Sequence, residues 1–328
     1  MKAVVLRRFG GPDVLETIDL PSPMPGPGEV RIRVRAAGVN FAETLMRENR
    51  YALTPPLPAV LGSEVAGEVE AVGAGVAVAL GTRVVAPLFA AGLFFGGYAE
   101  EVIAPAEWSV PIPDGLDFDT ATALTVQGTT AALLIERAPV AGKTVLVDAA
   151  AGGVGSLLLQ LARRAGAKRV IAAAGSAEKR AFALSLGADA AVDYGAADWS
   201  EAVRTANGGA GPDVIFDSVG GRVTEDCLAL LAPLGQMVIF GALNIRSFGL
   251  GVPELMRLIF ANQSVTGFAA APLLTPEKCR AIMAELFARV IAGDLAVTIG
   301  GVHPLAEAGA AHAALEGRRT IGKIVLRP

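Results

Sequence analysis

The stretch DAAAGGVG, from Asp148 to Gly155, lies between an apolar run and a segment with helical spacing. The residues before it, Lys143 to Val147, are mostly β-branched and apolar, which predicts a buried strand. After it, leucines recur at helical spacing as far as Ala165, which predicts a helix. A strand, a glycine turn and a helix together present backbone N–H groups to a phosphate at the helix N-terminus. The stretch therefore predicts a dinucleotide site.

The turn matches the dinucleotide fingerprint G-x-G-x-x-G only in part. In that register Ala150 takes the first glycine position, and Gly152 and Gly155 take the other two. On its own this pattern is also compatible with an ordinary tight turn between a strand and a helix. The rest of the sequence must distinguish between these two interpretations.

The chain after residue 123 alternates predicted strands with predicted helices. Six strands separated by helical crossovers indicate a doubly wound parallel sheet, the Rossmann arrangement. The predicted strands are Thr144–Ala149, Arg169–Ala174, Ala190–Asp193, Asp213–Ser218, Gln236–Gly241 and Ser264–Phe268, and the predicted helices are Val154–Ala165, Ala177–Leu186, Trp199–Thr205, Arg222–Leu231 and Pro253–Ala261.

The first third of the chain is rich in short strands with glycine and proline between them. Glu29–Ala37 alternates apolar residues with arginines, as in a strand with one solvated face. A helix is predicted to begin near Asp119, with an Asp or Thr cap. The tail after residue 272 is too short to stand alone, so we expect it to return to the first domain. The fold class is α/β, with one domain from 1–122 and 272–328 and a Rossmann domain from 123–271.

The predicted elements of the tail are a helix at Glu277–Ala292, a strand near Ala296–Ile299, a helix at Leu305–Leu315 and a last strand at Lys323–Arg327.

Composition excludes several classes of protein. The 328 residues carry a net charge of −4 and no basic run, which argues against nucleic acid as a partner. No signal peptide or membrane span is expected, because the most apolar windows are short or interrupted by proline and glycine. Cys227 and Cys279 form no CxxC pair, which suits a reducing, cytoplasmic setting.

Several motifs in order along the chain carry a family resemblance. They are VNFAET at 39–44, LGSEVAGEV at 61–69, GYAE at 97–100, AAAGGVG at 149–155, FDSVG at 216–220 and GKIV at 322–325. Together they resemble the zinc-independent quinone oxidoreductase (zeta-crystallin-like) branch of the medium-chain dehydrogenase/reductase superfamily. The resemblance implies a GroES-like catalytic domain built from both chain ends, an inserted Rossmann domain and a homodimer.

The sequence does not offer the ligands of a zinc site. No cysteine precedes Cys227, and Ser63 stands in the middle of the stretch that resembles the family's G-H-E motif. His303 and His312 both lie in the tail, where we interpret them as structural. We therefore expect no metal and a hydride transfer that needs no Lewis acid.

The loop after the second Rossmann strand predicts NADPH as the cofactor. No carboxylate stands at the strand end to bind a ribose 2′-OH, and Lys179 and Arg180 bring positive charge to the loop. The resemblance assigns the 2′-phosphate to Ser176, Lys179 and Tyr194. The alternative is that the two basic residues form only the solvated face of a helix, and Glu178 beside them weakens the prediction.

The resemblance implies further contacts to the cofactor. Besides Asn40 and the residues just named, these are Gly152, Gly153, Val154 and Gly155 of the turn, Thr129, Ser218, Phe240, Gly241, Phe268 and Arg318. Arg319 is an equally good candidate for the place of Arg318.

The residues expected near the substrate are Asn40 and Tyr51. The resemblance places Asn40 next to the nicotinamide, although an asparagine there also suits a turn after a strand. Tyr51 matches a tyrosine of the acceptor pocket, but Leu45 and Glu43 depart from the usual tyrosine and aspartate. We interpret Glu64 as a structural carboxylate.

The expected activity is hydride transfer from NADPH to a quinone or to the β-carbon of an α,β-unsaturated carbonyl. An enoyl or alkenal double-bond reductase is the alternative within enzymes. A catalytically silent NADPH-binding structural protein is the alternative from another class. The sequence does not identify the proton donor.

Overall fold

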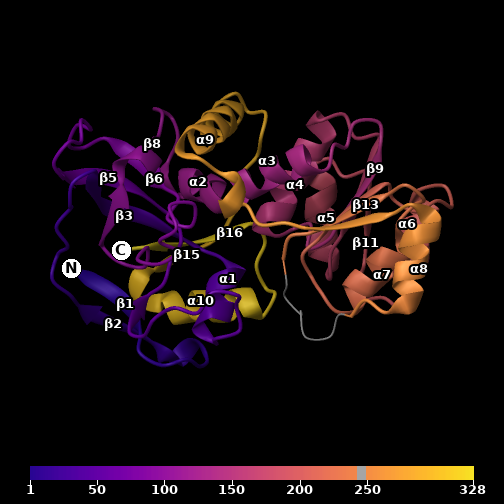
Figure 1. Ribbon diagram of the computed structural model, residues 1–328, viewed down its shortest axis with the longest axis horizontal. Helices are drawn as coiled ribbons and strands as arrows, with labels where there is room; N and C mark the ends of the chain where they lie inside the picture. Colours follow the sequence, from indigo (N-terminus) through magenta and orange to yellow (C-terminus); the bar gives the residue numbers. More distant parts are fainter. Residues whose placement is uncertain (242–248) are drawn as a thin grey trace. The chain divides into compact units, whose positions relative to one another are not determined.

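The computed structural model describes residues 1–241 and 249–328. The chain forms two compact units, one from Met1–Thr129 with Ala270–Pro328 and one from Thr130–Ala269 (Figure 1). Among the described residues, no helix is long and apolar enough to cross a membrane.

The first unit contains two β-sheets. A seven-stranded sheet has the order β15-β16-β3-β5-β6-β8, with β7 also paired to β3, and a three-stranded sheet has the order β2-β1-β4. The strands are β1 (Lys2–Leu6), β2 (Leu15–Asp19), β3 (Glu29–Val39), β4 (Ala59–Val60), β5 (Val65–Val72), β6 (Arg83–Ala86), β7 (Glu101–Pro105), β8 (Val110–Pro111), β15 (Ile299–Pro304) and β16 (Lys323–Arg327).

Helices and helical turns complete the first unit. They are η1 (Pro12–Val14), α1 (Phe41–Arg47), η2 (Ala106–Trp108), α2 (Phe118–Ala123), η3 (Leu124–Gly128), η5 (Ala271–Leu273), α9 (Pro276–Ile291), η6 (Leu305–Glu307) and α10 (Ala308–Glu316). The predicted return of the tail is confirmed, because β16 pairs with β3 in the interior of the sheet.

The alternation predicted for β3 is also confirmed. Its apolar side chains, Val30, Ile32 and Val34, are buried in the core of the first unit. On the opposite face Arg33 pairs with Glu70, as expected for a solvated face of a strand.

The second unit is a six-stranded, all-parallel sheet with the order β11-β10-β9-β12-β13-β14. The strands are β9 (Thr144–Val147), β10 (Arg169–Ala173), β11 (Ala190–Val192), β12 (Val214–Asp217), β13 (Gln236–Ile239) and β14 (Ser264–Gly267). Numbered from β9 as strand 1, the order is 3-2-1-4-5-6, which is the Rossmann order. The predicted doubly wound sheet is thus confirmed, with β14 at its edge.

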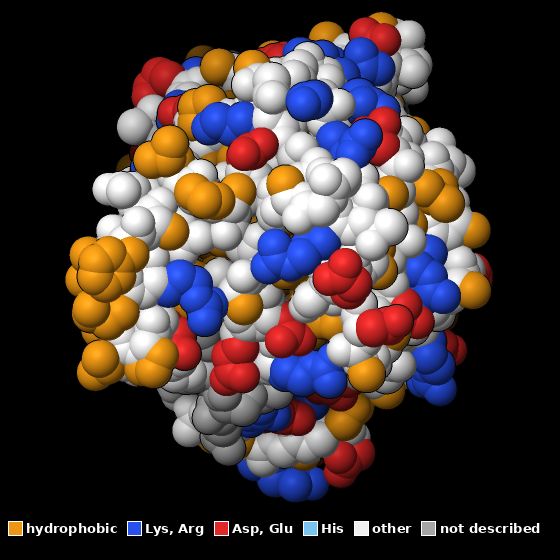
Figure 2. All heavy atoms as spheres, turned by 90° about the vertical axis from the view of Figure 1, so that its right-hand side faces the viewer, with side chains coloured by type: hydrophobic (Ala, Val, Ile, Leu, Met, Phe, Trp, Pro, Cys, Tyr) orange, Lys and Arg blue, Asp and Glu red, His pale blue; other side chains and the backbone are white. Residues whose placement is uncertain are grey.

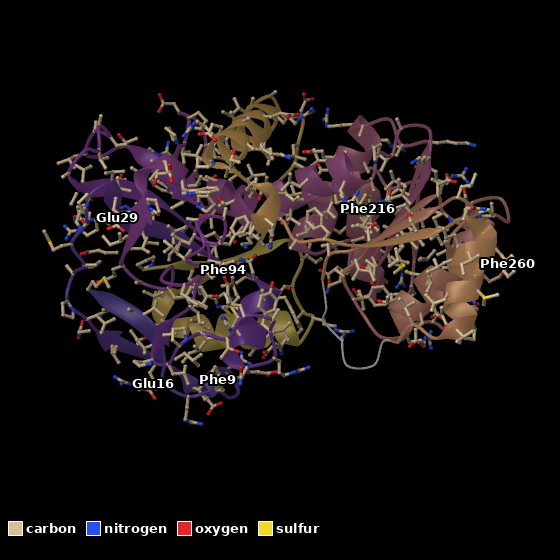
Figure 3. The ribbon with its side chains drawn as sticks, in the orientation of Figure 1. Phe9, Glu16, Glu29, Phe94, Phe216 and Phe260 are labelled. Carbon is tan, nitrogen blue, oxygen red and sulfur yellow. The ribbon has the colours of Figure 1, made fainter. Side chains whose placement is uncertain are left out.

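The helices between these strands are α4 (Gly153–Arg164), α5 (Ala177–Ser185), α6 (Trp199–Ala206), α7 (Arg222–Leu230) and α8 (Val252–Ala261), and α3 (Thr129–Arg137) leads into the unit. The central strands β9 and β12 are buried throughout, as their unbroken apolar runs predicted. Phe216 of β12 lies inside this unit, whereas Phe260 of α8 stands at its surface (Figure 3).

Two predictions about element ends were wrong. The cap of α2 is Asp117, whose carboxylate accepts a hydrogen bond from the Thr120 N–H at 2.8 Å, whereas Asp119 pairs with Arg327. The strand expected near Ala296–Ile299 begins only at Ile299, because its two glycines gave no apolar alternation and the pairing carries a bulge. The short strands β2 and β4 were not predicted.

Candidate functional site

The glycine turn is closely packed against the strand that precedes it. Gly152 donates its N–H to the Ala149 carbonyl at 2.8 Å, and Ala149 itself has a positive φ of 43°. A Cβ added to Gly155 would lie 2.5 Å from the Ala149 carbonyl oxygen, so only glycine fits there. The helix that follows, α4, begins at Gly153 with its first N–H groups unpaired within the helix. This is the predicted geometry for holding a diphosphate.

The turn lies at the point where the strand order of the sheet reverses. Strand β9, which leads into it, pairs with β10 on one side and with β12 on the other. The two neighbours continue the chain in opposite directions across the sheet. Parallel sheets of this kind bind ligands at such a point, outside the carboxyl ends of the strands.

The end of β12 carries a predicted contact residue, Ser218. Its N–H and its hydroxyl both donate to Asp148 Oδ1, at 2.9 and 3.1 Å. A Cβ added to Gly241 would lie 2.8 Å from Ser218 Cβ, so the ends of β12 and β13 touch. Phe240 and Phe268 follow β13 and β14, where each donates its N–H to the neighbouring strand. The structure thus brings these predicted residues together at the carboxyl ends of neighbouring strands.

The loop after β10 holds the residues predicted for the 2′-phosphate. Ser176 caps α5, and its hydroxyl accepts a hydrogen bond from the Lys179 N–H at 3.3 Å. The ring of Tyr194 lies over Gly175, 3.4 Å from the place of a Cβ there. Arg180 is held by Asp193 at 2.7 Å. Arg180 is therefore neutralised by its partner, and no carboxylate stands at the end of β10.

In the first unit, Asn40 lies at the centre of a buried polar cluster. Its Oδ1 accepts from Lys323 Nζ at 2.8 Å, and its Nδ2 donates to Glu64 Oε1 at 2.8 Å. Lys323 also pairs with Glu64, whose other oxygen accepts from the Val126 N–H at 2.6 Å. The interpretation of Glu64 as a structural carboxylate is confirmed. The amide of Asn40 is largely committed to these protein partners.

A second arm of this cluster begins at Glu43. Ser63 donates its N–H and its hydroxyl to Glu43, and Tyr98 donates its hydroxyl at 3.0 Å. Burial raises the pKa of the Glu43 carboxyl, against the opposing effect of these hydrogen bonds. The carboxylate of this glutamate, which stands where the resemblance has an aspartate, is thus surrounded by polar donors.

His312 continues this arm and confirms its predicted structural role. Its Nδ1 lies 3.2 Å from the guanidinium of Arg47, and its Nε2 lies 3.0 Å from the Tyr98 hydroxyl. Because Arg47 can only donate, Nδ1 accepts and the proton is on Nε2. Burial, together with Arg47, lowers the pKa of His312 to about 3. The imidazole is neutral, and the polarity of the chain of hydrogen bonds is fixed.

The remaining predicted residues have diverse surroundings. The hydroxyl of Thr129 donates to the carbonyls of Thr125 and Val126, inside its own helical segment. Tyr51 is 40% exposed, and burial of the rest of its ring, together with Glu43, raises its pKa. Arg318 lies in a turn with a positive φ of 54°.

The structure adds functional candidates that the sequence reasoning missed. The sequence analysis assigned no role to Lys323 or Asp148. Lys323 begins the buried strand β16, and Asp148 follows the buried strand β9. A charged residue at the end of a buried strand needs a partner, and this signal could have indicated both.

The chain was compared with protein families and curated relatives. The family model for the alcohol dehydrogenase GroES-like domain matches residues 26–114, and that for zinc-binding dehydrogenase matches residues 153–289. A quinone oxidoreductase of Pseudomonas aeruginosa is 38% identical over 100% of this chain and 99% of the relative. The chain belongs to the quinone oxidoreductase branch of the medium-chain dehydrogenase/reductase superfamily.

Other members of this branch agree with the assignment. A 2-haloacrylate reductase of a Burkholderia species is 35% identical over 99% of this chain and 98% of the relative. The Escherichia coli quinone oxidoreductase, solved in complex with NADPH, is 30% identical with a TM-score of 0.92, and the match covers 100% of both chains.

One of the two family descriptions names zinc, but the residues of this quinone oxidoreductase family member do not fit a zinc site. Ser63 donates its hydroxyl to Glu43, and Glu64 is already paired with the ammonium group of Lys323. Elsewhere in the described residues, Asp148, Asp217 and Cys227 come together, but burial raises the pKa of the Cys227 thiol well above its usual range. Zinc binds the thiolate, which this environment disfavours.

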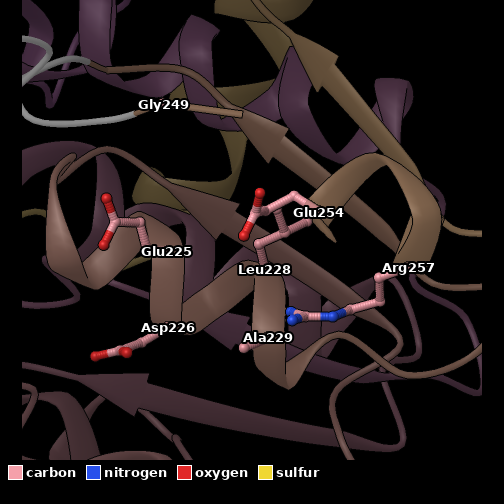
Figure 4. Close-up of a pocket in the computed structure, with 7 residues that line it drawn as sticks. All are labelled: Glu225, Asp226, Leu228, Ala229, Gly249, Glu254 and Arg257. Carbon is pink, nitrogen blue, oxygen red and sulfur yellow. The ribbon is translucent and has the colours of Figure 1, made fainter. Parts of the chain in front are cut away.

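A pocket lies between α7 and α8 (Figure 4). It has a volume of about 410 Å³ and contains none of the predicted site residues. The side chains that line it are Glu225, Asp226, Leu228, Ala229, Glu254 and Arg257, with Gly249.

Proposed function

We propose that this chain is an NADPH-dependent oxidoreductase that transfers a hydride to a quinone or to a similar α,β-unsaturated carbonyl compound. The observation that carries the proposal is the match to quinone oxidoreductases over the whole chain, with a glycine turn that leads into the N-terminus of α4. The loop at Ser176–Arg180, which lacks a carboxylate at its strand end, supports NADPH over NADH.

The chain supplies binding and orientation, and NADPH when bound supplies the hydride. The first N–H groups of α4, at Gly153 to Gly155, would hold the diphosphate. Ser176, Lys179 and Tyr194 would hold the 2′-phosphate, where the charge of Lys179 favours a doubly ionised group. Ser218, Phe240, Gly241 and Phe268 form the rim at the strand ends; Thr129 and Arg318 stay proposed contacts.

On the acceptor side we propose different roles for Asn40 and Tyr51. Asn40 fixes the end of β3 and the start of α1 through Lys323 and Glu64, because its amide is committed to them. Tyr51 has a partly exposed phenol hydroxyl, which is protonated at neutral pH as in any tyrosine. It is therefore able to donate a proton to the oxygen that becomes negative when hydride arrives.

A double-bond reductase is the second candidate, favoured by the relative that reduces 2-haloacrylate. Both reactions place a hydride on an activated carbon, so the acceptor decides between them. The experiment is a screen of quinones, enones and enoyl thioesters, in which the oxidation of NADPH is measured by absorbance. Turnover of quinones above the other two classes supports the proposal, turnover of enones or thioesters favours the second candidate, and tight NADPH binding with no turnover identifies a silent binding protein.

We also propose that the protein is a homodimer that pairs through the edge of the parallel sheet. Strand β14 is an edge strand, and neighbouring α8 has no buried residue. Figure 2 shows hydrophobic side chains gathered on one side of the molecule. On α8, Val252, Ile259 and Phe260 are 72%, 65% and 78% exposed. An apolar helix together with a strand whose outer edge is unpaired suits a second copy of the same chain.

The compartment we propose is the cytoplasm. Cys227 and Cys279 are both buried and free, as expected in a reducing setting.

A further inference from the structure

Two buried acids meet at the point where the strand order reverses. Asp148 follows β9 and Asp217 ends β12, and neither side chain has exposed surface. An oxygen of each lies within 4.8 Å of the other and of the Cys227 sulfur of α7. No ion pair with a basic side chain of the described residues compensates either acid. Two uncompensated anions at this distance are costly, so one proton is retained.

The hydrogen bonds identify the oxygen that holds this proton. Asp148 Oδ1 accepts two hydrogen bonds from Ser218, whereas Asp148 Oδ2 is buried with no donor. Asp217 Oδ2 accepts from the Thr224 hydroxyl at 2.5 Å. A proton on Asp148 Oδ2 therefore finds an acceptor on Asp217. Burial, followed by the charge of Asp217, raises the pKa of Asp148 well above its usual range.

The groups around the pair add no positive charge. The other titratable group that faces it is the Cys227 thiol of α7. The Cys227 thiol is itself kept neutral by its burial. The pair thus carries a single negative charge, at the residue that leads into the turn where an anionic diphosphate is expected.

We propose that the Asp148–Asp217 pair, sharing one proton, is a positioning element of the dinucleotide site that fixes Ser218 beside the glycine turn. The inference rests on the proposed NADPH-dependent function. Ser218 is held by Asp148 on one side and by the close approach of Gly241 on the other. The acid pair acts through Ser218 and the turn, and touches no reacting atom.

The test compares Asp148→Asn with Asp148→Ala in NADPH binding. An asparagine keeps an acceptor for Ser218 and a donor toward Asp217, as the protonated acid does, so its Kd stays within about threefold of wild type. An alanine leaves the Ser218 N–H without its acceptor and removes the proton that Asp148 shares with Asp217, so its Kd rises roughly tenfold. Asp213→Asn is the matched control, since Asp213 bridges the same two strands at their opposite ends through the Thr144 N–H. Its Kd is expected to be unchanged.

A second readout needs no cofactor. The unfolded chain releases the Asp148 proton near its ordinary pKa of about 4, while the folded chain keeps it, so wild-type stability falls as pH rises above that value. Asp148→Asn lacks this loss, and its melting temperature should rise relative to wild type as pH is raised above about 5. Asp213→Asn should show no such trend.

Three outcomes would overturn parts of this picture. Equal pH trends for wild type and Asp148→Asn would show that Asp148 is ionised, and would overturn the shared proton. Unchanged NADPH affinity in Asp148→Ala, with only a lowered melting temperature, would overturn the positioning role. Failure of the wild type to bind NADPH would instead overturn the proposed function, and the pH trend would still be read without it.

Discussion

Lys323 and Glu64 form an ion pair in which the side chains are 1% and 0% exposed, although the residues stand 259 positions apart in the chain. Together with Asn40, the pair joins the last strand, β16, to the end of β3. A buried pair of this kind contributes little if both partners are replaced by apolar groups, but the loss of one partner leaves the other charge uncompensated.

Lys323→Met is therefore expected to lower the free energy of unfolding by about 3–5 kcal/mol. The measurement is urea unfolding followed by Trp108 fluorescence in a Trp199→Phe background, since the chain has two tryptophans, one in each unit. Lys2→Met, at an exposed position in the same unit, is the control. Adding Glu64→Gln to Lys323→Met should recover part of the loss, and a loss below about 1 kcal/mol in the single variant would contradict the assignment.

His312 makes stability depend on pH with a defined sign. Its folded pKa of about 3 is below the ordinary value of about 6.5, so the unfolded chain binds the proton first. The stability from the neutral imidazole is complete above about pH 6.5 and is lost, at about 1.4 kcal/mol per pH unit, as pH falls toward 3. His312→Gln should flatten this slope, and His303→Gln should keep it. Identical slopes in wild type and His312→Gln would rule out the neutral buried histidine.

Lys179→Ala should weaken the use of NADPH selectively. The loss of one charged contact to the 2′-phosphate is expected to lower kcat/KM for NADPH roughly ten- to a hundredfold, with kcat/KM for NADH within about threefold of wild type. Lys168→Ala is the control, since Lys168 is exposed and stands at the amino end of β10. An unchanged ratio of the two cofactors in Lys179→Ala would defeat the assignment of this loop.

Alanine substitutions at the two glycines of the turn should weaken NADPH binding to different degrees. A Cβ at Gly155 would lie 2.5 Å from the Ala149 carbonyl oxygen, whereas a Cβ at Gly152 would lie 3.1 Å from the same atom. Gly155→Ala should thus displace the turn and weaken NADPH binding by about tenfold or more, and Gly152→Ala should have a smaller effect. Fluorescence titration with NADPH measures both. The reverse order would show that the turn is not constrained as described.

Phe260→Lys combined with Ile259→Lys should convert the proposed dimer into a monomer. Two charges placed on the apolar face of α8 would have to be desolvated at the interface. Sedimentation velocity of both proteins gives the answer, with Leu80→Lys, an exposed leucine of the other unit, as the control. A wild-type monomer, or a dimer that survives the double change, would argue against this face.

The parallel sheet and its glycine turn could be predicted from the sequence because their signals are local. Each strand is a short apolar run, and each crossover helix has its own spacing, as in β9 and α4. The strand β15 was misplaced because Gly300 and Gly301 hide its alternation, and its pairing with β16 is decided by residues far away in sequence.

The site was predictable only where a motif carries its own chemistry. Gly152, Gly155 and Ser176 belong to such motifs, and the structure places them at a turn and a helix cap as expected. The partners of Asn40 could not be predicted, because Lys323 reaches it only through the pairing of the two ends of the chain. Likewise, nothing local to Asp148 indicates that Asp217 faces it.

The interior position of β16 in its sheet also determines when the first unit can be finished during synthesis. Residues 130–269 form a continuous unit, and the ribosome releases all of them before it makes Lys323–Arg327. Until then the residues of β3 that pair with β16, from Ala37 to Val39, lack this partner, and Glu64 has no ammonium group to neutralise it. The Rossmann unit can therefore fold while the chain is still being translated, whereas the β-rich unit is complete only after β16 has been made.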